Sequence, residues 1–543
     1  MHYFIKIVSR CSLLAFVFAL TACKDLTELN INPNGVTLQS ANPSLLMSGV
    51  LPSVADMYLQ LGYNENISGV MQYMQKAYHN DAFNYYDWTN MDWGGYYDNL
   101  RNDMGAYQVA EERGNHYLMG EALIMKCFLF GLLTDLWGDI PYTHAVQGEQ
   151  GGEDNLTPPY DDQQAVYTGI LNDLEAAVAI MGNIKPGEEV ADEYYGGDAN
   201  KWARFANSLR LRYFMRISTK LPEQAKAGIA EIYQSGLYFK SNADDATYSY
   251  SGATGSSSWP NSLKFDGSSG AEYRYLQMCQ TFVDSLQARN DPRLRVWANK
   301  VEIPIVISNT HNPDDPDVVD NGIRYIHQDA IPSGTVVNTD EYVGIPPGIV
   351  APDAWNLNPT PGQQGFNPHV SHLNTIYTEA SGPLLKARLQ SYAEVCFIFA
   401  EAALKWGVAG GNAESWYNKG IQASLETWGV GDAFSTYISG PAVAFDGSLN
   451  QIMTQKWIAN WTVALEAWFD YRRTGYPALT SGPNTQRAVL PLRFMYPSSE
   501  YTLNKYSLET AVDHMEETGF SGAQGKDSPW SKMWVLQGTN KPW

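Results

Sequence analysis

Residues 202–218 read WARFANSLRLRYFMRIS, and their spacing predicts an amphipathic helix. Phe205, Leu209, Tyr213 and Ile217 recur at every fourth position and fall on one stripe, while three arginines line another. A helix of this kind buries its apolar stripe against a neighbour. The stretch therefore predicts a protein built from packed helices.

The same periodicity recurs along most of the chain. It predicts helices near 41–62, 65–80, 95–113, 116–137, 160–181, 199–219, 222–235, 383–407, 412–428 and 448–473. Short links between them favour helix pairs stacked as in a tetratricopeptide array, although no repeat motif appears at that array's usual period. We predict a mainly α fold, in which tetratricopeptide-like helix pairs form a scaffold and long irregular loops form a binding face.

Two segments break this helical pattern. Those near 241–275 and 300–383 are rich in Gly, Pro, Asn, Asp and Ser, and compact domains seldom keep such long irregular stretches without a use for them. Binding residues concentrate on loops that a rigid frame holds. We interpret the two segments as loop-rich insertions in a single helical domain that spans 41–543.

The composition narrows the class of ligand. Of the 543 residues, 44% are hydrophobic and 17% are charged, which is typical of a globular protein. The formal charge is −22, and no basic run of useful length is present. Because nucleic-acid binding requires lysines and arginines that neutralise phosphates, we expect no nucleic-acid partner.

The first residues resemble the leader of a bacterial lipoprotein. Lys6 and Arg10 precede an apolar run that is too short to span a bilayer, and the run ends in LTAC (20–23). This resemblance to a lipobox implies a signal peptide over 1–22, cleavage before Cys23, a diacylglycerol on its sulfur and an acyl chain such as palmitate on its amino group. Residues 23–40 would then form a lipidated tether. The alternative is an ordinary secretory signal with an incidental cysteine.

Three cysteines remain in the mature chain: Cys127, Cys279 and Cys396. Cys127 and Cys396 lie in apolar helical runs, and an odd, widely spaced set does not suit a disulfide framework or a metal site. We expect buried free thiols.

The stretch NYYDWTNMDWGGYYDN (84–99) holds six aromatic residues and no basic one. Its first part, Tyr85, Tyr86, Asp87 and Trp88, lies in a polar, loop-like setting. Sugar rings stack on aromatic side chains and their hydroxyls bond to carboxylates, while the same groups could hold a peptide through its cationic side chains. These four residues are candidate ligand contacts, and core packing is the alternative.

Further aromatic residues lie in the two loop-rich segments. Exposed rings there suggest recognition, although the rings could instead pin the loops to the body. The candidates are Trp259, Tyr273, Tyr275, Trp355 and Phe366.

Motifs for catalysis are absent from the sequence, which has no H-E-x-x-H, C-x-x-C, G-x-G-x-x-G or G-x-S-x-G. Glu466 and Asp470 could be a glycosidase pair, but they lie one helical turn apart beside Arg472 and Arg473, which favours a structural ion-pair cluster. We predict that the protein is not an enzyme and needs no cofactor.

An acidic turn is the single metal candidate from the sequence. Asp315, Asp317 and Asp320 could gather oxygen ligands for a structural calcium ion, but their spacing is not that of an EF-hand. A solvated acidic turn without metal is the alternative.

Seven stretches, in order, resemble the SusD/RagB family of nutrient-binding outer-membrane lipoproteins, in particular its branch with an EAWFDYRRTGYP ending. They are LNINPN (29–34), LWGDIPYTHA (136–145), KWARFANSLRLRYFMRIS (201–218), DPRL (291–294), SYAEVCFIFAEAAL (391–404), QKWIANWTVALEAWFDYRRTGYPAL (455–479) and RFMYPSSEY (493–501). The resemblance implies a scaffold of tetratricopeptide-like helix pairs with binding loops on one face. It also implies that Trp93 and Tyr97 pack inward.

The resemblance further implies a partner and a place in the cell. The partner is a TonB-dependent outer-membrane transporter of the SusC/RagA type, over which the lipoprotein lies as a lid. The protein would be lipid-anchored in the outer membrane of a Gram-negative bacterium and exposed at the cell surface. There it would capture an oligomeric nutrient, an oligosaccharide or alternatively an oligopeptide. A surface glycoside hydrolase is a further alternative.

Overall fold

A computed structural model describes residues 42–265, 271–363 and 366–540. The predicted signal peptide, the tether and Cys23 lie outside the described residues, as does part of the first loop-rich segment. The unit that begins at Pro43 is described here by itself.

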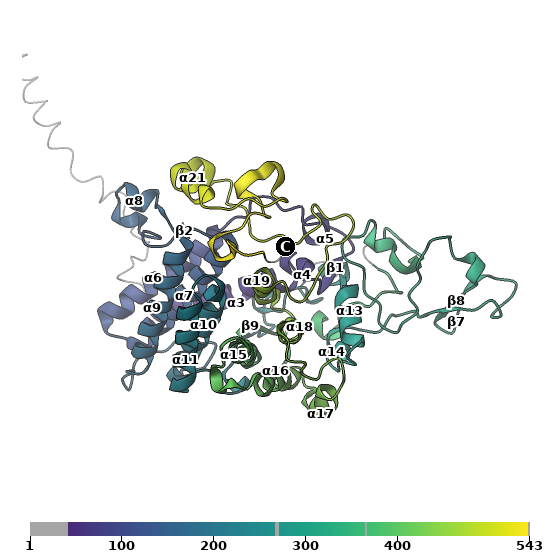
Figure 1. The fold of residues 1–543 in the computed structure, drawn as a ribbon, viewed down its shortest axis with the longest axis horizontal. Coiled ribbons are helices and arrows are strands. Elements are labelled where there is room, and N and C mark those ends of the chain that lie inside the picture. Colours follow the sequence, from purple (N-terminus) through teal and green to yellow (C-terminus); the bar gives the residue numbers. More distant parts are fainter. Residues whose placement is uncertain (1–41, 266–270, 364–365, 541–543) are drawn as a thin grey trace, which may run out of the picture. The chain divides into compact units, whose positions relative to one another are not determined.

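Helices from the first half of the chain stack side by side, each against the next (Figure 1). They are α3 (Pro43–Tyr63), α6 (Gly94–Arg113), α7 (His116–Trp137), α9 (Gln163–Met181), α10 (Ala199–Arg216) and α11 (Pro222–Ser235). The stack confirms the predicted scaffold of helix pairs. Its central member, α7, is the one described helix that is long and apolar enough to cross a membrane, and 89% of that stretch is buried inside the protein.

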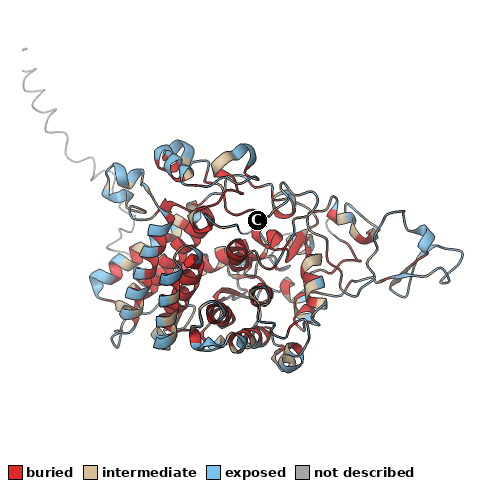
Figure 2. Cartoon of the chain, in the orientation of Figure 1, coloured by how far each residue is buried: buried red, intermediate tan, exposed pale blue. Residues whose placement is uncertain are grey.

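A second helical group packs on this stack through α10. It consists of α15 (Tyr392–Trp406), α16 (Ala413–Thr427), α18 (Leu449–Ala459) and α19 (Ala464–Thr474). Figure 2 shows that the buried residues run through both groups, so they share one core. Cys127, Cys279 and Cys396 are buried free thiols, as predicted.

Several helices approach closely at glycines. A methyl group on Gly131 of α7 would collide with the phenol of Tyr213 on α10. A methyl group on Gly420 of α16 would lie 2.9 Å from the ring of Phe397 on α15. The absence of a side chain at these positions lets an aromatic ring of the facing helix reach the backbone.

Buried ion pairs tie the two helical groups together. Glu466 of α19 accepts a hydrogen bond from Arg216 at 2.6 Å and lies 3.4 Å from Arg212, both on α10. Asp470 pairs with Lys456 at 2.6 Å and with Arg473 at 2.9 Å.

Burial alone would raise the pKa of Asp470, but Lys456 and Arg473 outweigh it and hold that pKa below its ordinary value. The predicted structural ion-pair cluster is therefore confirmed.

Three predicted helices are partly wrong. The segment predicted over 65–80 is the short helix α4 (Asn66–Val70) followed by strand β1 (Met74–Lys76), which pairs with β5 (Leu276–Met278). The segment predicted over 383–407 begins as strand β9 (Lys386–Gln390), paired with β4 (Ala246–Ser249). Partner strands distant in sequence override local periodicity in both segments.

The third predicted helix, over 448–473, is divided. It consists of α18 and α19, which are separated by residues 460–463, where Thr462 has φ +70°. A residue at positive φ cannot continue a right-handed helix.

Short elements complete the fold. The helices are α5 (Asp81–Asn84), α8 (Glu153–Leu156), α12 (Ala271–Tyr275), α13 (Gln280–Gln287), α14 (Leu294–Trp297), α17 (Phe434–Ile438), α20 (Glu500–Leu503) and α21 (Lys505–Asp513). The strands are β2 (Ile140–Pro141), which pairs with β3 (Tyr160–Asp161), and a sheet in the order β6 (Ile305–Ile307), β8 (Ile323–Ile326), β7 (Asp317–Asp320).

Candidate functional site

Strand pairing brings together aromatic residues that are almost 200 positions apart in sequence. Because β1 pairs with β5, the residues that follow β1 lie beside those that precede β5. The rings of Tyr78 and Tyr275 are 5.6 Å apart, and the rings of His79 and Tyr275 are 5.5 Å apart. The segment after β1 and the last residue of α12 therefore present adjoining rings, none of which is fully buried.

A further segment, 349–363, contacts the same region. Tyr78 donates a hydrogen bond to Oδ2 of Asp353 at 3.3 Å, and the backbone N–H of Gly362 donates to the same oxygen at 2.9 Å. Tyr85 donates to the carbonyl of Ile349 at 2.9 Å. The same segment carries Trp355, which is half-buried.

We call this region the aromatic loop surface. Its residues are half-buried or exposed. They come from the segments that follow β1 and α5, from the end of α12, from 349–363 and from position 366. They are Tyr78, His79, Tyr85, Tyr275, Trp355 and Phe366. Such a surface offers flat apolar faces together with phenol and carboxylate groups, a combination that suits an oligosaccharide.

Four of the candidates predicted from the sequence lie on this surface: Tyr85, Tyr275, Trp355 and Phe366. Asp87 is exposed next to it in sequence. Tyr78 and His79 were missed, because their segment reads as a helix and the strand pairing that exposes them has no local signal.

The expectation of exposed rings is wrong for Tyr86, Trp88 and Trp259, which are 1%, 4% and 1% exposed. Trp88 packs edge-on against Trp468 and Phe494, with ring centroids 5.7 and 5.2 Å apart, and its indole donates to the carbonyl of Ala82. Burying a large aromatic ring contributes more to stability than burying a small side chain, so these three residues pack in the core.

Trp259 and Tyr273 both hold loop segments against the rest of the domain. The ring of Trp259 meets that of Tyr63 edge-on at 5.0 Å. Tyr273 is half-buried and donates to the carbonyl of Leu373 at 2.7 Å, and burial raises the pKa of its phenol to about 12. In the inward-facing pair, Trp93 is buried, as the resemblance implied, and Tyr97 is half-buried.

The three aspartates of the predicted calcium site do not gather around one point. Arg324 donates to both carboxylate oxygens of Asp317, at 2.8 and 2.7 Å, and His311 lies 3.4 Å from Asp320. Among the described residues, Asp315, Asp317 and Asp320 do not converge on one point. Calcium binding there stays an untested prediction.

A separate cavity of about 390 Å³ opens between α3 and the start of α6. Its lining combines carboxylates with aromatic rings: Asp56, Glu65, Asp92, Tyr96, Trp137 and Phe494. Burial raises the pKa of Asp56 and of Glu65, so both carboxylates would gain from a cation placed beside them.

Comparison with known proteins gives a consistent result. A family model described as starch-binding and associating with the outer membrane matches residues 33–309 and 325–497. No curated protein sequence matches the chain.

Solved structures share the fold. A SusD homologue from Bacteroides fragilis is 23% identical, covers 92% of this chain and 100% of its own, and has a TM-score of 0.72. A chitin-binding SusD homologue from Flavobacterium johnsoniae is 22% identical, with 92% and 99% covered and a TM-score of 0.67. A SusD-like protein from Bacteroidetes is 25% identical, with 91% and 99% covered and a TM-score of 0.68.

Proposed function

Because the chain belongs to the SusD-like family of starch-binding proteins that associate with the outer membrane, we propose that it captures an extracellular oligosaccharide at the cell surface. We propose further that it is held there by lipid on Cys23 and delivers the ligand to a TonB-dependent outer-membrane transporter of the SusC/RagA type. The aromatic loop surface is the observation that carries the proposal.

The chemistry of this surface suits a sugar polymer. Tyr78 and Tyr275 present adjoining rings, on which the C–H face of a pyranose can stack. Asp353, held by Tyr78 and Gly362, supplies acceptors for hydroxyl groups. Several half-exposed rings spread over three segments match an oligomer better than a single sugar.

Binding without catalysis is part of the proposal. Glycoside hydrolysis uses two carboxyl groups on either side of the scissile bond. Glu466 and Asp470, the pair that the sequence offers, are buried and ion-paired, so a sugar cannot come between them.

An oligopeptide ligand is the second candidate, and the acidic cavity favours it. Asp56, Glu65 and Asp92 around aromatic walls form a suitable pocket for a lysine or arginine side chain. The same pocket would also take the ammonium group of an amino sugar, so the ligand must be identified by experiment.

The test is calorimetric titration of the purified protein with malto-oligosaccharides, chito-oligosaccharides and a tryptic peptide mixture. We expect at least one oligosaccharide class to bind. Tyr275→Ala and Trp355→Ala should each weaken that binding by about 1–3 kcal/mol, as loss of a ring from a binding hot spot does.

Tyr506→Ala is the matched control, because Tyr506 lies on α21 and is 85% exposed. It should leave the affinity unchanged. Binding of peptides alone would select the second candidate, and unchanged affinity in both loop variants would show that the aromatic loop surface is not the binding site.

A further inference from the structure

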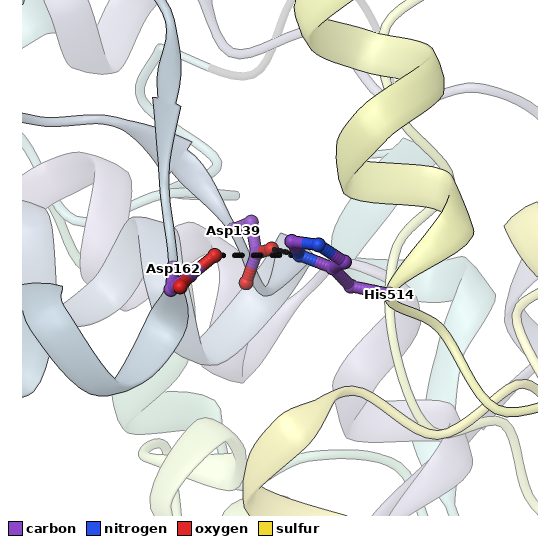
Figure 3. Close-up of side chains that lie close together, drawn as sticks. All are labelled: Asp139, Asp162 and His514. Carbon is purple, nitrogen blue, oxygen red and sulfur yellow. Dashed lines mark hydrogen bonds and ion pairs between the residues drawn. The ribbon is translucent and has the colours of Figure 1, made fainter.

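Three potential metal ligands from separate elements meet where the C-terminal helix α21 reaches the scaffold (Figure 3). Asp139 directly precedes β2, Asp162 directly follows β3, and His514 caps the C-terminal end of α21. One donor atom from each residue lies within 4.8 Å of the other two.

Strand register forces the two carboxylates together. Ile140 of β2 pairs with Asp161 of β3 in antiparallel register, which sets Asp139 opposite Asp162. Like charges placed opposite each other on paired strands repel. A cationic group between them relieves this repulsion.

His514 is the group that faces both acids. Its Nδ1 lies 2.7 Å from Oδ2 of Asp139 and 3.3 Å from Oδ1 of Asp162. Across the described ranges, no lysine or arginine forms an ion pair with either carboxylate. One imidazole carries at most one positive charge, so the cluster keeps a net negative charge even when His514 is protonated.

We propose that Asp139, Asp162 and His514 bind a divalent transition-metal ion of the zinc class. One imidazole nitrogen and two carboxylate oxygens are ligands that Zn²⁺ accepts, whereas Mg²⁺ and Ca²⁺ prefer oxygen alone. Donors about 2.1 Å from a tetrahedral zinc ion lie about 3.4 Å apart, close to the separation of His514 and Asp162. The bond between His514 and Asp139 would open by several tenths of an ångström.

A neighbouring group already orients one of the ligands, as is usual at metal sites. The backbone N–H of Gln163 donates to Oδ1 of Asp139 at 2.8 Å and leaves Oδ2 to face His514. The side-chain amide of Gln537 donates to the backbone carbonyl of His514 at 2.6 Å, which fixes the end of α21 at this place. Asp139 is buried, whereas Asp162 and His514 are exposed, so an ion can enter from solvent.

The ion would cross-link α21 to the β2–β3 pair and to the start of α9. Because three protein ligands leave a fourth position open, water or a donor from a bound molecule would complete the shell. This site does not depend on the aromatic loop surface or on the ligand bound there.

The experiment uses the purified, chelator-treated protein with ZnCl₂, MgCl₂ and CaCl₂ as probes in calorimetry and thermal melting. We expect one zinc site, a melting temperature that rises with zinc, and weaker binding of the two hard cations. His514→Ala should lower zinc affinity by at least about tenfold. Asp162→Asn should do the same, and because Asp162 is exposed this variant keeps the fold.

His116→Ala is the matched control, because Nδ1 of His116 pairs at 2.9 Å with a single carboxylate, that of Glu188. It should bind zinc as the wild type does. Absence of zinc binding by the wild type would overturn the proposal, as would equal zinc affinity in His514→Ala, in Asp162→Asn and in the wild type. A loss in His116→Ala as large as that in His514→Ala would also overturn it.

Discussion

Two acidic residues of the scaffold, Asp103 on α6 and Glu121 on α7, are fully buried, and their carboxylate oxygens accept no hydrogen bond from the described residues. Burial raises the pKa of both side chains well above the ordinary range, and the nearby charge of Asp192 adds to the effect at Glu121. Burial therefore favours the neutral form of both acids. They contrast with Glu466, whose arginine partners hold its pKa low against the effect of burial.

The first prediction concerns Glu121→Gln. A carboxyl whose folded pKa is raised adds stability below its unfolded pKa and loses it as the pH rises toward the folded value. Above the unfolded pKa, this side chain should lower the wild-type free energy of unfolding as the pH rises, by at most about 1.4 kcal/mol per pH unit, because the folded state holds one proton that the unfolded state has lost. Urea unfolding between pH 5 and 7 should show a shallower decline for Glu121→Gln.

Glu111→Gln is the control for this prediction, since Glu111 is exposed on α6. Its unfolding free energy should follow the wild-type pH dependence. Parallel pH profiles for the wild type and Glu121→Gln would contradict the prediction.

Residue spacing predicted that Glu466 and Asp470 belong to an ionic core, but it did not predict which basic residues from distant segments pair with them. Glu466 and Asp470, one turn apart beside two arginines, indicated an ion-pair cluster. Arg216, 250 positions from Glu466, supplies the closest contact. Only packing of α10 on α19 could reveal that pair.

At the scale of elements, the sequence predicted most long helices to within a few residues. Helical periodicity is a property of neighbouring residues, so α7 and α11 have the predicted bounds. Strands β1 and β9 were missed because each is short and owes its conformation to a partner elsewhere in the chain.

The second prediction tests the close approach of α7 and α10. Gly131→Ala should lower the free energy of unfolding by about 1–3 kcal/mol, because the added methyl group collides with Tyr213 and forces the helices apart. Urea denaturation measures the change.

Gly49→Ala is the matched helical control, since a methyl group on this exposed residue of α3 meets no atom within 4 Å. It should stabilise the protein by about 0.5–1 kcal/mol, because alanine loses less backbone entropy than glycine on folding. Equal effects of the two substitutions would show that the helices are not closely packed at Gly131.

At the scale of the whole molecule, the proposed function joins the binding surface to a lipid anchor outside the described residues. Each buried methylene group contributes about 0.8 kcal/mol to membrane binding, so two or more acyl chains hold a protein stably where one does not. In the proposed function the anchor depends on Cys23, a residue that takes no part in the fold of the described residues.

The third prediction concerns this anchor. Cys23→Ala should leave folding intact and move the protein from the membrane to the soluble fraction. Cys11→Ala should stay membrane-bound, because Cys11 belongs to the segment that we expect to be cleaved. Fractionation and mass spectrometry of the mature N-terminus measure both effects, and a mature N-terminus without acyl chains would contradict the prediction.

The sequence by itself determined the helical class, the free thiols and two acids of the ionic core, Glu466 and Asp470. Each depends on apolar spacing or on residues one or two turns apart. Tertiary structure alone decided which aromatic rings face solvent. Trp88 is buried because Phe494 packs on it from 406 positions away. Tyr275 stays half-buried, and it lies beside Tyr78 because β1 pairs with β5. Burial depends on contacts between distant segments, which the order of residues along one helix or loop does not specify.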